Sequence, residues 1–213
     1  MTTAIIGTGG IGSVIARQLA SGGETLRLSS ADPQSARTLA GQIGSAAVAV
    51  AGNRHAVQGC DAVVLALRFT VLQGVIAEIA ESLTDKLVVV PSNPVGVDAR
   101  GNVTRLLPTG QSSGVVVAGW LPARASLAMA FGTMSADRFE SASNRSPELA
   151  VLFYVADDDR AGQKVEPLIR RAGFEPVKAG GLEQSDRLEV GGDLHDRVVG
   201  LAEARSLIGR PVG

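Results

Sequence analysis

Six residues near the amino terminus, Gly7-Thr8-Gly9-Gly10-Ile11-Gly12, follow the pattern G-x-G-x-x-G. They come directly after an apolar run at 3–6 and open a segment in which Ile11, Ile15 and Leu19 recur every four residues. In a strand-to-helix turn of this kind, the first glycine permits the tight turn, the second lets the backbone approach a pyrophosphate, and the third lets the helix pack on the strand. Amide groups at the helix start then bind the anion. The motif therefore predicts a dinucleotide site, and a glycine-rich turn without a ligand is the alternative.

The end of the second expected strand, Leu28-Ser29-Ser30-Ala31, carries no carboxylate. A site that prefers NAD usually has Asp or Glu about 20 residues after the glycine motif, where it binds the ribose 2′-hydroxyl. Without it a 2′-phosphate is not repelled, and Ser29 and Ser30 can donate hydrogen bonds to that group. Asp32, which precedes Pro33, is expected to cap the next helix. NADP is therefore expected rather than NAD.

Short runs rich in Val, Ile and Ala alternate with helix-period segments along the chain, which is typical of an α/β fold with a parallel sheet covered on both faces. Strands are expected at 3–6, 25–28, 46–51, 61–67, 86–90, 125–131, 149–156 and from 177, with helices in most of the intervals. Ser92-Asn93-Pro94 opens a loop of roughly 20 residues, a length that is usually functional. Periodicity alone leaves 113–117 open between helix and strand.

The tail is expected to form a helix with an apolar face made by Leu194, Val198, Leu201 and Ile208. Little chain remains to cover this face, so a homodimer with the helix near its interface is predicted, and burial within the monomer is the alternative.

Charge and cysteine content exclude several classes of protein. Lys plus Arg total 20 and Asp plus Glu total 21, so no basic surface for nucleic acid is expected. Cys60 is the single cysteine, and with His55 and His195 as the two histidines no metal site is expected. No long apolar stretch or basic leader is apparent, so no membrane contact is expected and a cytoplasmic location is predicted.

Taken together, the glycine turn, the segment 28–33 and the strand Asp61-Ala62-Val63-Val64-Leu65-Ala66-Leu67 resemble the F420-dependent NADP reductase family. Later segments follow in the same order and spacing, namely Ser92-Asn93-Pro94, Ala130-Phe131-Gly132-Thr133, Ala156-Asp157-Asp158-Asp159, Gly173-Phe174-Glu175-Pro176-Val177 and Ala179-Gly180-Gly181-Leu182-Glu183. The resemblance implies a doubly wound Rossmann domain at 1–134 and a small C-terminal α/β domain at 135–213. It also implies a helix after Gln111 that ends near Leu121-Pro122.

The resemblance further implies NADP on the Rossmann domain and the deazaflavin coenzyme F420 in the cleft between the domains. The pyrophosphate would lie on Thr8, Gly9, Gly10 and Ile11, and the 2′-phosphate at Ser30, Ala31 and Ser35. The family usually has Arg at the position of Ala31 and often Lys at that of Ser35, so weaker binding of the phosphate is expected here.

The ring of the second coenzyme would lie over the nicotinamide. Its surroundings would come from the loop with Asn93 and Pro94, the strand end with Thr133 and Met134, and the small domain. Leu67, Arg68 and Phe69 would meet NADP beside the glycine turn, where Phe69 keeps an apolar contact near the cofactor and Arg68 either supplies the charge missing at Ala31 or faces solvent. The family places a larger residue where this chain has Gly132, so the glycine is expected to widen the pocket or to leave the ring one contact short.

Hydride transfer between two flat rings depends on positioning and requires no acid-base side chain, so no catalytic residue is assigned. The chain is predicted to be an enzyme, an NADP-dependent oxidoreductase of the F420 type. Two alternatives stay open, an NAD(P)H-dependent reductase of another small substrate and a non-catalytic NADP-binding module.

Overall fold

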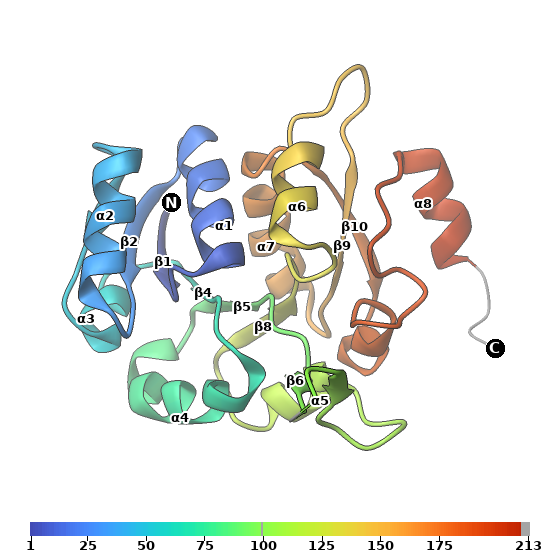
Figure 1. Cartoon of the computed structure of the whole chain (residues 1–213), viewed down its shortest axis with the longest axis horizontal. Helices are drawn as coiled ribbons and strands as arrows, with labels where there is room; N and C mark the ends of the chain where they lie inside the picture. The colour runs from blue at the N-terminus through green and yellow to red at the C-terminus, as the bar shows by residue number, and fades with distance from the viewer. Residues whose placement is uncertain (99, 210–213) are drawn as a thin grey trace.

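The computed structural model describes residues 1–98 and 100–209, in which eight strands form one sheet (Figure 1). The strand order is β10-β9-β8-β5-β4-β1-β2-β3, and every neighbouring pair is parallel except β8 and β9. The strands are β1 (Thr2–Ile6), β2 (Thr25–Ser29), β3 (Ala47–Ala49), β4 (Ala62–Leu65), β5 (Leu87–Val90), β8 (Ser126–Met129), β9 (Val151–Val155) and β10 (Glu175–Gly180). The predicted Rossmann-type α/β fold is confirmed.

Helices occupy both faces of this sheet. They are α1 (Gly10–Ser21), α2 (Pro33–Ile43), α3 (Asn53–Val57), α4 (Phe69–Ile79), α5 (Ser113–Ala118), α6 (Ala136–Ala142), α7 (Asp159–Arg171) and α8 (Leu201–Ile208), with 3-10 segments η1 (Ala80–Leu83) and η2 (Leu182–Arg187). Asp32 and Asp158 accept hydrogen bonds from the first amides of α2 and α7 and cap both helices. The helix that the family resemblance implied after Gln111 exists as α5, but it ends at Ala118 and not near Leu121-Pro122.

The strands send alternate side chains to two separate apolar cores. One core takes Ile5 and Val64 together with buried residues of α1, α2, α6 and α7. The other takes Ala4 and Ile6 together with buried residues of α3, α4, α5 and α8. Because side chains point to opposite faces at every second position of a strand, each strand contributes to both cores. The sheet is therefore the middle layer of three.

Strands β9 and β10 extend the same sheet rather than forming a separate one. The pairing of β9 with β8 is short, because within the described residues Met129 and Val155 form its single residue pair. Strands from both sides of residue 134 therefore share one sheet. The division into domains at 1–134 and 135–213 stays a prediction.

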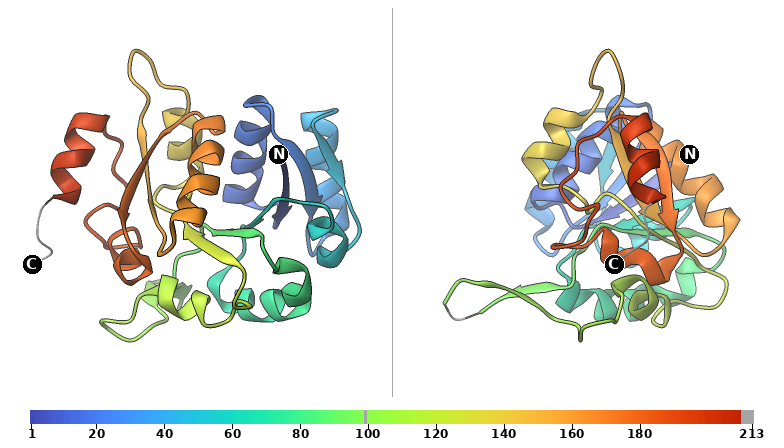
Figure 2. Two further views of the ribbon diagram at one scale, coloured as in Figure 1. Left: turned by 180° about the vertical axis from the view of Figure 1, so that it is seen from behind. Right: turned by 90° about the vertical axis from the view of Figure 1, so that its right-hand side faces the viewer.

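The long loop after Ser92 contains regular structure that the sequence pattern does not predict. β6 (Val95–Val97) and β7 (Val103–Arg105) pair antiparallel, with Val97 directly opposite Val103. This hairpin extends away from the rest of the molecule (Figure 2), and the side chains of both valines are largely exposed. Two-residue alternation over so short a run is too weak a signal to predict it.

The expected tail helix is shorter than predicted. It begins at Leu201, so Leu194 and Val198 belong to the irregular segment before it. Leu201, Leu207 and Ile208 pack against the second core, close to β10. These three side chains stay partly exposed, so the chain covers this apolar face only in part, and the homodimer stays a prediction. Within the described residues, no helix is long and apolar enough to cross a membrane.

Candidate functional site

The glycine turn connects β1 to α1, and its backbone meets the neighbouring strands closely. Gly7 has a φ of 100°, and a Cβ there would lie 2.2 Å from the carbonyl oxygen of Ala66. A Cβ on Gly12 would lie 2.1 Å from the carbonyl oxygen of Gly7. Both positions therefore require glycine, one for the left-handed turn and the other for close packing.

Gly9 and Gly10 face open space, since a Cβ at either position would meet no atom within 4 Å. Gly9 caps α1 without any side-chain hydrogen bond to the first amides of the helix. The hydroxyl oxygen of Thr8 is buried and lacks a hydrogen-bond partner among the described residues. Free amides, open space and an unpaired hydroxyl at one helix start fit the pyrophosphate of a dinucleotide.

Two of the three serines expected at the 2′-phosphate already have hydrogen-bond partners. Ser29 is 1% exposed, and its hydroxyl donates to Oδ1 of Asn53 at 2.9 Å. The hydroxyl of Ser35 donates to Oδ2 of Asp32 at 2.7 Å. Ser30 is half-buried at the turn between β2 and α2. Spacing along the chain could not show the bond from Ser29, because Asn53 lies in a later helix.

An open cleft lies where the glycine turn meets the ends of three strands, with about 650 Å³ of space continuous with solvent. Its walls come from the glycine turn, the loop after β4, the loop after β5, the start of β6 and the segment after β8. The lining residues are Ile11, Leu67, Arg68, Phe69, Pro91, Ser92, Asn93, Val95, Gly132, Met134, Ser135 and Ala136. Ligands of open α/β sheets bind at this position, outside the carboxyl ends of the strands at the point where the strand order reverses.

Six of the predicted site residues therefore line one cleft, but not all in the expected way. Phe69 is 7% exposed, and its ring packs 5.6 Å from that of Trp120, so most of it belongs to the core. Pro94 is buried at the base of the hairpin, where its carbonyl accepts a hydrogen bond from the amide of Leu106 at 2.8 Å. Pro94 is absent from the described lining of the cleft.

The expectation that Gly132 widens a pocket is wrong, and the alternative that the ring is one contact short stays a prediction. A Cβ at this position would lie 2.1 Å from the carbonyl oxygen of Pro91, so the glycine lets two loops meet and does not widen a pocket. The preceding residue, Phe131, is fully buried with a φ of 66° and packs on Phe139. Such a φ is costly for a bulky residue and turns the chain sharply at the end of β8.

Ser92 and Asn93 connect the loops of the cleft to one another. The hydroxyl of Ser92 donates to the carbonyl of Leu67 at 2.5 Å. Nδ2 of Asn93 donates to the carbonyl of Gly132 at 2.9 Å, and its Oδ1 accepts from the amide of Val190 at 2.8 Å. Asn93 thus positions three segments, and both polar atoms of its amide are already bonded.

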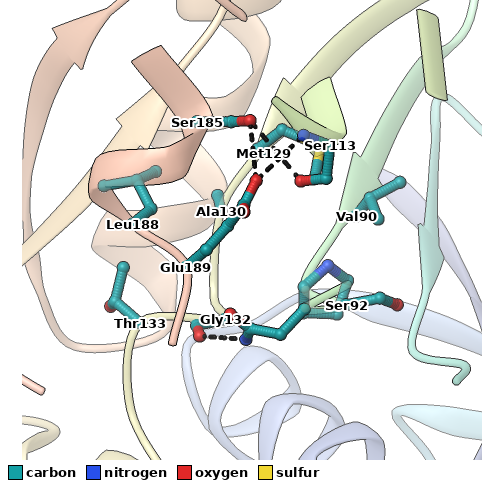
Figure 3. A pocket seen from close by; sticks show the side chains of 12 residues that line it. Val90, Ser92, Ser113, Met129, Ala130, Gly132, Thr133, Ser185, Leu188 and Glu189 are labelled. Carbon is teal, nitrogen blue, oxygen red and sulfur yellow. Dashed lines mark hydrogen bonds between the residues drawn. The ribbon is translucent and has the colours of Figure 1, made fainter. Parts of the chain in front are cut away.

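A second, inner cavity adjoins the open cleft and shares Pro91, Ser92, Asn93 and Gly132 with it. It contains about 250 Å³ of empty space and is lined on its far side by Ser113, Met129, Ser185, Leu188 and Glu189 (Figure 3). Thr133 lines this inner cavity and not the open cleft. Thr133 is 1% exposed, and its hydroxyl has no hydrogen-bond partner among the described residues.

Glu189 is the charged group of the inner cavity, and it lies between Ser113 and Ser185 (Figure 3). Its Oε1 accepts from the amide of Ser113 at 2.9 Å and from the hydroxyl of Ser185 at 3.1 Å. Its Oε2 lies 2.5 Å from Nη1 of Arg105, on the hairpin. Burial by itself would raise the pKa of the Glu189 carboxyl, but the hydrogen bonds from Ser113 and Arg105 outweigh it and hold the pKa below its ordinary value. The sequence could not reveal this cluster, because Glu189 lies more than 70 positions from both Ser113 and Arg105.

Neither histidine lines the cleft or the inner cavity. His55 lies on α3 with Nδ1 2.9 Å from the carbonyl of Ala51, and His195 lies with Nδ1 3.0 Å from the carbonyl of Leu188. Cys60 is 3% exposed, as expected for a small core residue. Within 1–98 and 100–209, no three His, Cys, Asp or Glu side chains come together in a way that could hold a metal ion.

Residues 2–94 match the model of a family described as NADP oxidoreductase, coenzyme F420-dependent, which confirms the resemblance over that part of the chain. No curated protein matches the chain.

Solved structures share the fold. A hypothetical protein from Sinorhizobium meliloti is 25% identical with a TM-score of 0.82, over 94% of this chain and 95% of that chain. A proposed F420-dependent NADP reductase from Arthrobacter sp. FB24 is 21% identical with a TM-score of 0.71, over 85% and 86%. A pyrroline-5-carboxylate reductase from Coxiella burnetii is 15% identical with a TM-score of 0.64, over 87% of this chain and 61% of that one. Together with the family model, these matches support an NADP-dependent oxidoreductase.

Proposed function

We propose that this chain, whose residues 2–94 match the F420-dependent NADP oxidoreductase family, transfers a hydride between NADP(H) and coenzyme F420. The composition of the open cleft carries the proposal: of its twelve lining residues, Arg68 is the single ionisable one. A reaction that needs a general acid or base would require a titratable donor or acceptor within hydrogen-bond reach of the substrate. Direct hydride transfer between two rings needs walls that align them.

The residues of the cleft are suited to that task. The glycine turn and Thr8 would hold the pyrophosphate, while Ile11, Pro91 and Met134 offer apolar surface for flat rings. When bound, the nicotinamide would supply or accept the hydride. Arg68 is exposed at the rim, where a cation favours a partner that carries negative charge.

The proposal is tested by mixing purified protein, NADPH and oxidised F420 and following the deazaflavin absorbance. We expect turnover with the parent protein and none with Gly9→Val, because the added side chain occupies the open space that the pyrophosphate needs. Titration of each protein with NADPH, followed by cofactor fluorescence, separates failed binding from failed transfer. NADPH binding without any F420 turnover would reject F420 as the partner.

A second candidate is an NAD(P)H-dependent reductase of a smaller substrate, and the inner cavity favours it. This cavity has no room for a deazaflavin, and its 250 Å³ of space includes space open to solvent, so only the reacting group of a small substrate would enter it. The unpaired hydroxyl of Thr133 offers one hydrogen bond there. Small carbonyl and imine compounds should then oxidise NADPH while F420 does not, and Thr133→Val should raise KM for the small substrate.

If NADPH binds and neither F420 nor any small substrate is reduced, the chain is a non-catalytic dinucleotide-binding module. The homodimer proposed from the sequence is independent of these outcomes.

A further inference from the structure

The turn between β2 and α2 lies directly beside the glycine turn. Ile6 pairs with Ser29 in the parallel register of β1 and β2, and the amide of Gly7 donates to the carbonyl of Ser29 at 2.8 Å. In a dinucleotide held on the glycine turn, the ribose of the adenosine half falls at the end of the second strand. The inference about the groups near the 2′-position of the ribose rests on the proposed function, which includes binding of such a cofactor.

The amide donors at the start of α2 are occupied by a side chain of the same turn. The carboxylate of Asp32 accepts from the amide of Gln34 at 3.0 Å and from that of Ser35 at 3.3 Å. The hydroxyl of Ser35 adds a third hydrogen bond at 2.7 Å. A phosphate that approached this helix start would find these donors taken by another anion.

The Asp32 carboxylate is charged and exposed at neutral pH. The hydrogen bond from the Ser35 hydroxyl, followed by that from the Gln34 amide, lowers the pKa of this carboxyl. Within the described residues no cation forms an ion pair with Asp32; the nearby Arg37 directs its Nε to Gln34 at 3.2 Å. The turn therefore presents a negative charge that no ion pair neutralises.

We infer that Asp32 is a specificity-determining residue of the cofactor site. Its carboxylate accepts a hydrogen bond from a ribose 2′-hydroxyl and repels a 2′-phosphate, so it reduces the preference of this chain for NADPH over NADH. Asp32 lies three residues after Ser29, the last residue of β2, in the turn that follows the strand end where NAD sites carry their acidic ribose ligand. Its role as a helix cap does not exclude this second role, because a carboxylate has about four sites for hydrogen bonds.

Dissociation constants for NADPH and NADH, measured by fluorescence titration, test the inference without any turnover. Asp32→Asn and Asp32→Ser remove the charge but keep a residue that caps helices well. We expect the affinity ratio to shift toward NADPH by about fivefold in both variants, the size of an exposed charge interaction. In the parent the ratio should also move toward NADPH as salt is raised, because salt screens the repulsion, and this dependence should shrink in the variants.

Asp158→Asn is the matched control. Asp158 caps α7 and accepts from the amide of Ala161, so the chemical change is the same. β9 runs antiparallel to β8, and Asp158 lines a surface hollow with Ala125 and Leu127 at the start of β8. It therefore lies at the edge of the sheet opposite the glycine turn, and its substitution should leave the ratio unchanged.

An unchanged ratio in both Asp32 variants, or equal shifts in the Asp158 control, overturns the inference while leaving the proposed function intact. A parent protein that binds neither cofactor, or a Gly9→Val variant that binds both as well as the parent, overturns the proposed function and this inference with it.

Discussion

Single residues in the cleft act mainly through backbone geometry. Gly132 is the clearest case, because the carbonyl oxygen of Pro91 stands where its Cβ would be. The neighbouring Phe131 keeps a left-handed backbone while its ring is buried against Phe139. These two residues set where the chain after β8 meets the loop after β5, and so they shape both the cleft and the inner cavity.

Gly132→Ala should destabilise the protein by about 1–3 kcal/mol, because the added methyl group forces two backbones apart. Urea denaturation followed by circular dichroism measures the free energy of unfolding. Gly74→Ala is the control: Gly74 lies inside α4, and a Cβ there would have no neighbouring atom within 4 Å, so alanine should be neutral or stabilise by up to about 1 kcal/mol. Equal effects of the two substitutions would contradict the role assigned to Gly132.

At the scale of elements, Arg105 attaches the hairpin of β6 and β7 to the rest of the fold. Arg105 on β7 pairs with Glu189, and Nη2 of Arg105 also donates to the carbonyl of Gln111 at 2.8 Å. A hairpin of two short strands is marginally stable alone, so this attachment decides where it lies. Since Glu189 also binds Ser113 at the start of α5, one carboxylate joins the hairpin, α5 and the segment after η2.

Stability should fall on acidification in a way that depends on Glu189. Its folded-state pKa is depressed, so its contribution is present above the unfolded pKa of about 4.3 and is lost as pH falls through the folded pKa. Glu189→Gln should therefore be less stable than the parent at pH 7, with the difference shrinking as pH falls into the acid range. Urea titrations across that range measure this.

Glu183→Gln serves as the control for that series, because Glu183 is exposed in the neighbouring η2. If the parent and Glu189→Gln lost stability in parallel as pH falls, this result would contradict the contact between Arg105 and Glu189.

At the scale of the whole molecule, the parts before and after residue 134 share a core and an ion pair. Ile15 and Leu19 of α1 belong to the same cluster as Leu168 of α7. The side chain of Glu24 is fully buried; its Oε1 accepts from the hydroxyl of Thr3 at 2.7 Å, and its Oε2 lies 3.0 Å from Nη1 of Arg171. We therefore expect the two parts to unfold together.

Arg171→Ala should cost about 3 kcal/mol, because it leaves the buried carboxylate of Glu24 without its cation. Arg170→Ala is the neighbouring control; its contact with Glu166 is exposed, so the loss should stay within about 0.5 kcal/mol. Fluorescence of the single tryptophan, Trp120, and far-UV circular dichroism should give coincident transitions in urea. Separate transitions would support two independently folding domains.

The homodimer remains a prediction at this scale. The apolar face of α8 is partly buried against the second core, so removal of that helix should affect stability and not association alone. Light scattering at micromolar concentration gives the mass in solution, and a monomer would contradict the prediction.

The sequence by itself determined the alternation of strands and helices, the glycine turn and the cap at Asp32, because each of these depends on residues that are close together in the chain. Periodicity was enough to place β1, β2, β4 and β5 within a few residues. It was insufficient where short segments depend on distant partners, as in the hairpin at 95–105 and the shortened helix α8.

Only the tertiary structure decided which polar groups are free at the site. Ser29 and Ser35 have the right spacing for a phosphate, but Asn53 and Asp32 already accept their hydroxyl hydrogen bonds. From the sequence, Gly132 suggests a side chain missing from a pocket, whereas in the structure the carbonyl of Pro91 occupies the place of its Cβ. Hydrogen bonds and close contacts join residues far apart in the chain, and their partners exist only once the sheet has brought the strand ends together.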